Sequence, residues 1–185
     1  IARALDAAVP EPPLLPRDTA ERARVEAAER WGDETLQPLA RRVIWNVLNR
    51  DPRGRRSYLE GARLGVPVGL ATKTAAPLVY LSKRFNAADD DAVRADLESL
   101  PEVVARADAY LAEGVIGGET VNAADLQIAT GIRLLMTMDD TRPAIEGHPI
   151  AAYALKLVPD YPGYSPAALP DEWKRTSRDP AGVTA

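Results

Sequence analysis

The sequence predicts an all-α protein, a bundle of about seven helices. Apolar residues recur at three- and four-residue spacing along most of its 185 residues, as one face of an amphipathic helix requires. No run of useful length alternates apolar and polar residues, so we expect no strand. Hydrophobic residues make up 46% of the chain, which is enough for a sizeable core.

The first long helix is expected over residues 18–49. Pro38 lies inside its apolar pattern and should kink the helix, because proline removes one backbone hydrogen bond. Ala28 and Gly32 lie one turn apart and would let a partner helix approach closely. Later helices are expected over residues 57–64, 66–85 with a kink at Pro77, 86–100 with Asn86 as the cap, 102–113 after a break at Pro101, 122–138 and 149–158.

The chain divides by composition into four parts. Residues 1–9 have helical spacing with neither an initiator Met nor a signal-peptide pattern, so we expect them to be the end of a helix of a preceding domain. Residues 10–17 contain four prolines and predict a stiff interdomain linker, with a surface loop as the alternative. An all-α domain is expected over residues 18–178 and a flexible tail over residues 179–185.

Composition excludes several kinds of chemistry. The chain has no cysteine and a single histidine, His148, which argues against thiol nucleophiles and against a metal site. The net charge of −4 argues against nucleic acid, and no apolar run is long enough to cross a bilayer, so we expect no membrane partner. These features fit a cytoplasmic protein. An arginine cluster is interpreted as a solvated helix end rather than an anion site; it comprises Arg41, Arg42, Arg50, Arg53, Arg55 and Arg56.

The stretch "GGETVNAADLQIATG" predicts a structural helix start. Asn122 as N-cap would accept a hydrogen bond from the backbone N–H of Asp125, whose carboxylate would accept from the N–H of Asn122. This is a capping box with Asp in place of Glu. Val121 and Leu126 take the two positions of a hydrophobic staple. The helix that follows is apolar nearly all round and belongs at the centre of a bundle, so its Arg133 would need a partner, for which Asp139 and Asp140 are within reach.

This arrangement resembles the C-terminal all-α domain of cytosolic glutathione S-transferases, of the bacterial type. "GGETVNAAD" is similar to the family's capping motif, with Asn in place of Ser or Thr. "RVEAAERWGDETLQPLARRV" resembles the first long helix of that domain, and "RPAIEGHPIAAYALKLVP" resembles the helix after the buried one. "IARALDAAVPEPPLLP" resembles the end of the family's thioredoxin-like domain and the linker that follows it.

The resemblance implies that the two domains of the family have different roles. In the family the thioredoxin-like domain binds glutathione and carries the catalytic residue, so we expect no catalytic residue here and an inactive fragment. The all-α domain supplies the site for a small hydrophobic electrophile and contacts of a homodimer. Carried onto this sequence, that site is the part of the first helix after Pro38, namely Arg41, Arg42, Trp45 and Asn49. The alternative is a non-catalytic binding or assembly module with the same fold.

Overall fold

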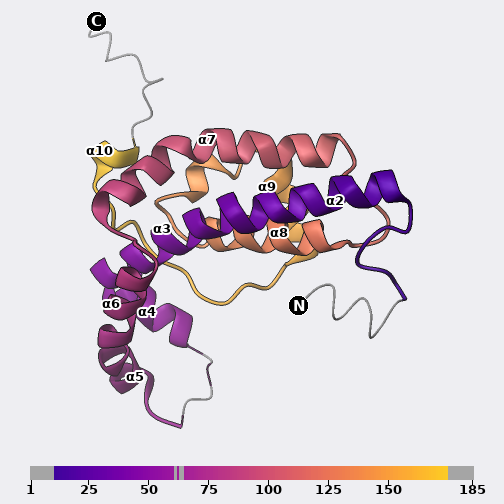
Figure 1. Ribbon diagram of the computed structural model, residues 1–185. Helices are drawn as coiled ribbons and strands as arrows, with labels where there is room; N and C mark the ends of the chain where they lie inside the picture. Colours follow the sequence, from indigo (N-terminus) through magenta and orange to yellow (C-terminus); the bar gives the residue numbers. More distant parts are fainter. Residues whose placement is uncertain (1–10, 61, 63–64, 175–185) are drawn as a thin grey trace, which may run out of the picture.

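The structure is a computed structural model that describes residues 11–60, 62 and 65–174, and within these residues the chain is all-α (Figure 1). The predicted fold class is confirmed. Outside the helices, the described residues contain one isolated β-bridge, between Met138 and Ser165. The predictions for residues 1–9 and 179–185 lie outside the described residues.

The first long helix is continuous but changes register in its middle. It comprises α2 (Thr19–Trp31), a π-helical turn η1 (Gly32–Leu36) and α3 (Gln37–Arg50). Asp18 is the N-cap and accepts from the backbone N–H groups of Ala20 and Glu21. The π turn precedes Pro38, and the backbone N–H of Gln37 donates to the carbonyl of Gly32. The kink expected from Pro38 is therefore absorbed by a wider turn just before it.

A small arm follows, which we call the α4–α6 arm. It contains α4 (Pro52–Leu59), α5 (Val68–Thr74) and α6 (Ala76–Phe85), and it projects from one end of the body (Figure 1). The sequence-based boundaries were wrong at two places. α4 begins at Pro52 rather than residue 57, because Asp51 caps it and proline is well suited to the first helical position. The expected helix over residues 66–85 is two helices, which break at Ala75 ahead of Pro77.

The body is built around one buried helix. α7 (Asp90–Ala112) packs with α3, and α9 (Pro149–Leu157) packs with α7 and α8. The central helix α8 (Ala123–Met136) contacts all of α2, η1, α3 and α9. Nine of the residues of α8 are buried, as its apolar sequence predicted. Gly32 and Gly131 permit the closest approach: a Cβ on Gly32 would lie 2.7 Å from Cγ of Gln127, and one on Gly131 would lie 2.9 Å from Cδ2 of Leu36.

Two further boundaries differ from expectation. Asp89, not Asn86, caps α7 by accepting from the N–H of Ala92, and Asn86 instead ends α6. α7 runs through Pro101 without a break, because buried side chains such as Leu97 and Val104 on both sides hold the helix against the core and offset the lost hydrogen bond. Beyond α9, the chain crosses the body to α10 (Asp171–Lys174), in which Trp173 is buried.

The proline-rich segment before α2 packs on the body. Leu15 is buried, and the carbonyl of Leu14 accepts a hydrogen bond of 2.8 Å from the N–H of Ala123, the first residue of α8. The described part of the proline-rich segment is thus fixed to the start of the central helix rather than standing clear as a spacer.

The turn between α6 and α7 contains a strained residue. Ala87 has φ of 49°, a left-handed conformation, and the N–H of Ala88 donates to the carbonyl of Lys83 while that of Ala87 donates to the carbonyl of Arg84. This is a Schellman motif in which alanine takes the position usually occupied by glycine.

Replacing Ala87 with Gly should therefore stabilise the protein by about 0.5–1 kcal/mol, because the relief of strain exceeds the added flexibility of the unfolded chain. Urea denaturation measures the effect. Ala95→Gly is the matched control: it is exposed in the middle of α7, and it should cost about 1 kcal/mol. Equal destabilisation by both substitutions would contradict this account of Ala87.

Candidate functional site

The start of α8 forms the predicted capping box. Oδ1 of Asn122 accepts from the backbone N–H groups of Ala124 at 2.9 Å and Asp125 at 3.1 Å, and Oδ2 of Asp125 accepts from the N–H of Asn122 at 2.8 Å. The remaining amide donor of Asn122 reaches the carbonyl of Val115 at 2.9 Å. Of the predicted staple pair, Val121 is half-buried and Leu126 is 42% exposed, so this pair lies at the surface.

The carboxylate of Asp125 does more than cap its own helix. It is fully buried, and its Oδ1 accepts from the N–H of Gly117 at 2.7 Å and from the hydroxyl of Tyr153 at 2.6 Å. Burial, and then the hydrogen bond to Asp125, raise the pKa of Tyr153 far above its ordinary value. The phenol therefore stays protonated and donates to the carboxylate of Asp125, and this hydrogen bond ties α9 to the start of α8.

Three of the four predicted ligand-site residues share one stripe of α3. Arg41, Trp45 and Asn49 are spaced by four residues, which places them on one face of the helix. Arg41 is exposed, whereas Trp45 and Asn49 are half-buried. Arg41 also lines a groove of about 150 Å³ between α3 and α8. The other lining residues are Gln37, Ala40, Gln127, Thr130, Gly131, Leu134 and Tyr161.

Arg42 is not part of this stripe, because its side chain contacts α7. Its Nε and Nη2 donate to the carboxylate of Asp96 on α7 at 2.7 and 2.6 Å. Burial raises the pKa of Asp96, and the two hydrogen bonds from Arg42 oppose that effect. A bidentate pair of this kind holds α3 to α7, so the guanidinium of Arg42 faces Asp96 on α7 and does not line the groove that Arg41 lines.

The remaining arginines of the cluster also have partners, with one exception. Arg50 pairs with Asp90 at 2.8 Å, Arg53 with Asp51 at 2.7 Å and Arg56 with Glu60 at 3.2 Å. Arg55 donates to the carbonyl of Leu48 at 2.9 Å. Within the described residues, Arg41 is the one member of the cluster for which no hydrogen bond or ion pair is found.

Sequence reasoning missed two polar links and misplaced a third. Nδ2 of the buried Asn46 donates to the carbonyl of Ala88 at 3.0 Å. Asp108 accepts from the N–H of Ile150 at 2.8 Å, and the ring of His148 lies 2.7 Å from it. Arg133 donates to the carbonyl of Val158 at 2.8 Å, not to Asp139 or Asp140. Each of these residues is a polar side chain inside an apolar stripe, which indicates that it needs a hydrogen-bond partner. The sequence does not show which partner, because the partners are distant along the chain.

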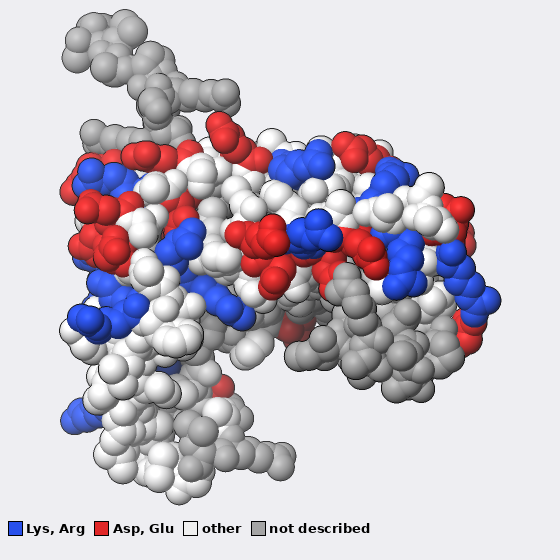
Figure 2. All heavy atoms as spheres, viewed as in Figure 1, with Lys and Arg blue, Asp and Glu red and all other residues white. Residues whose placement is uncertain are grey.

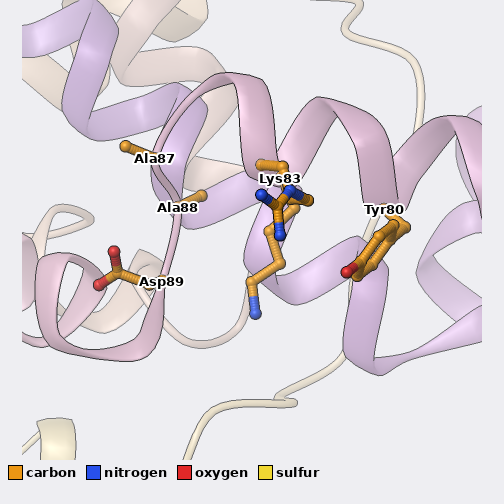
Figure 3. A pocket seen from close by; sticks show the side chains of 6 residues that line it. Tyr80, Lys83, Ala87, Ala88 and Asp89 are labelled. Atoms are coloured by element: carbon orange, nitrogen blue, oxygen red, sulfur yellow. The ribbon is translucent and has the colours of Figure 1, made fainter.

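A second hollow lies where the arm meets α7. It is a recess of about 430 Å³ lined by Tyr80, Lys83, Arg84, Ala87, Ala88 and Asp89 (Figure 3). Lys83 lies 3.7 Å from Asp90, whereas the described part of the chain offers Arg84 no ion pair. The recess therefore places cationic side chains beside the strained turn at Ala87.

No group of three or more potential metal ligands occurs among the residues that the structure describes. Among those same residues, no helix has the length and apolarity that crossing a membrane requires. No family model, no curated protein and no solved structure matches the chain.

The buried carboxylate gives a direct test of the cap. Asp125→Ala removes the acceptor of three donors and should lower the free energy of unfolding by about 3 kcal/mol, because buried donors would be left without partners. Urea denaturation measures it. Asp18→Ala is the matched control: the Asp18 bonds are exposed, so it should cost about 1 kcal/mol. Equal losses would mean that the additional bonds of Asp125 contribute nothing.

Proposed function

We propose that this chain is the all-α domain of a glutathione transferase-like protein, and that it supplies part of a binding site for a small hydrophobic electrophile. The observation that carries the proposal is the unpaired Arg41 in the groove between α3 and α8. Because the described residues offer Arg41 no acidic partner, its guanidinium is available to an anionic ligand or to the anionic end of an amphiphilic one.

The size of the groove supports a shared site. At about 150 Å³ it is smaller than the roughly 300–1,000 Å³ of ordinary ligand pockets. A second surface would have to complete it. In the proposed protein that surface is a thioredoxin-like domain, which would bind glutathione as co-substrate and contribute the catalytic residue, so the chain alone would be inactive. The capping box at the central helix is the family feature that supports this assignment.

The protein would work in the cytoplasm as a homodimer and bind no metal. A non-catalytic binding module is the second candidate. It is favoured by the chemistry of the groove, whose one ionisable group apart from Tyr161 is an arginine. Arginine stays protonated and is neither a base nor a nucleophile at neutral pH. Assay of thiol conjugation by the chain joined to a thioredoxin-like domain would separate the two candidates.

Binding of an apolar anion tests the groove. Titration with a naphthalene sulfonate should shift the amide NMR signals of Arg41, Gly131 and Tyr161, and Arg41→Ala should weaken binding about tenfold because a charge-assisted contact is lost. Arg30→Ala is the control, since Arg30 is exposed on α2 away from the groove. Shifts confined to the α4–α6 arm, or equal affinity of the Arg41 variant, would contradict the proposal. Retention of the chain on immobilised glutathione would contradict the assignment of that site to another domain.

A further inference from the structure

The α5–α6 part of the arm exposes large apolar side chains that the body could have buried. Phe85 is 92% exposed, Leu78 64% and Leu81 60%. These three recur at i, i+3 and i+7 on α6 and form one stripe. Val66, Leu70 and Tyr80 are each about half exposed and extend the apolar surface onto α5 and the neighbouring side of α6. Monomeric proteins rarely leave a contiguous apolar surface of more than a few hundred Å² in water.

The exposed apolar surface of α5 and α6 is not explained by the packing of these helices on the body. α5 and α6 have 7 and 10 residues, lengths at which a helix in water depends on packing of its apolar face. Between Val66 and Phe85 only Ala71, Thr72 and Val79 are buried. The small side chains face α3 and α4, and the large ones face solvent. The pattern is that of an amphipathic element whose main apolar face lies outside the protein.

Charge is distributed unevenly between arm and body. Residues 52–85 contain seven Lys and Arg and one Glu, a net charge of +6; since the chain carries −4, the remaining residues carry −10. Between residues 66 and 85 there is no acidic residue at all, and Lys73, Lys83 and Arg84 are the charged ones. Figure 2 shows the arm largely white, with the acidic side chains gathered on the body. Of these three cations, Lys83 lies 3.7 Å from Asp90, whereas the described residues offer Lys73 and Arg84 no ion pair.

We propose that the α4–α6 arm docks on an anionic lipid surface, with the stripe of Leu78, Leu81 and Phe85 entering the interface. Lys73 and Arg84 would then meet lipid headgroups, for which they are available because no described residue pairs with them. Apolar side chains with lysine and arginine beside them are typical of helices that lie in a membrane interface. The site departs from the expectation of no membrane partner, which rested on the lack of a spanning segment.

The shape of the molecule suits this mode of binding. The arm projects from one end of the body (Figure 1), and most of the acidic side chains lie on the body rather than on the arm (Figure 2). Repulsion between like charges is screened over about 8 Å at physiological ionic strength. The recess at the base of the arm is lined by Lys83, Arg84 and Asp89 (Figure 3). Lys83 lies 3.7 Å from Asp90, so Arg84 is the cation of this recess that would meet a headgroup.

A second copy of the chain fits the surface less well. A symmetric dimer through this stripe would place the same patch of both copies face to face. Each patch brings Lys73 and Arg84, for which the described residues offer no ion pair, and has no acid between residues 66 and 85, so like charges would meet at the edge of an apolar contact.

Vesicle binding tests the proposal with the full chain. Flotation with phosphatidylcholine vesicles containing about 30% phosphatidylserine should carry the protein, pure phosphatidylcholine vesicles should carry much less, and high salt should release it. Lys73→Gln with Arg84→Gln should lower the partition coefficient roughly 30-fold. Leu81→Ala and Phe85→Ala should each lower it several-fold, because apolar contact with the interface is lost.

Matched substitutions on the body serve as controls. Leu126→Ala and Leu155→Ala remove apolar side chains that are 42% and 44% exposed, and Arg30→Gln removes an exposed cation on α2; none should change vesicle binding. Circular dichroism checks that each variant is folded. No binding to anionic vesicles, equal binding to neutral ones, or equal effects of arm and body variants would overturn the proposal. So would an oligomer that Phe85→Ala dissociates, since the stripe would then be covered by a second copy.

Binding of the naphthalene sulfonate in the groove should not respond to the arm variants, so the two proposals can fail separately.

Discussion

The arrangement of the body depends on one buried carboxylate. Asp125 has no exposed surface, and a charge in that position is unfavourable unless donors surround it. The three donors come from the loop before α8, from the cap of α8 and from α9, through Gly117, Asn122 and Tyr153. The side chain of Asp125 therefore caps α8, holds the loop before α8 and positions α9. The bond from Ala123 to Leu14 adds the proline-rich segment before α2 to the same point.

The groove between α3 and α8 is set by close packing of the first long helix against α8. Gly32 approaches Gln127, and Gly131 approaches Leu36, at distances that leave no room for a further methyl group without movement. The π turn that contains Gly32 also takes up the register change imposed by Pro38. α3 consequently leaves the turn alongside α8, and Arg41, one helical turn beyond Gln37, lies in the groove between the two helices.

Local sequence signals predicted the capping box, whereas distant partners could not be inferred. Asn122 and Asp125 interact over three residues, so their spacing alone contains the geometry. Arg133 was expected to pair with a nearby acid, but its side chain reaches the carbonyl groups at the end of α9, 25 residues on. Arg42 and Asp96 are 54 residues apart, and nothing in the pattern of α3 distinguishes Arg42 from Arg41. Which of two adjacent arginines is available to a ligand depends on how α3 and α7 pack.

The α4–α6 arm differs from the body in how its charged side chains are paired. In the body, arginines at helix faces find carboxylates on neighbouring helices, as Arg42 and Asp96 do. In α5 and α6, Lys83 lies 3.7 Å from Asp90, but the described residues offer Lys73 and Arg84 no carboxylate. The largest apolar side chains of these helices are exposed. The buried residues of α5 and α6 are Ala71, Thr72 and Val79, and these helices pack against α4 and α3. The outward Leu81 and Phe85 therefore contribute little to folding, and their exposure is best explained by contact with a surface outside the protein.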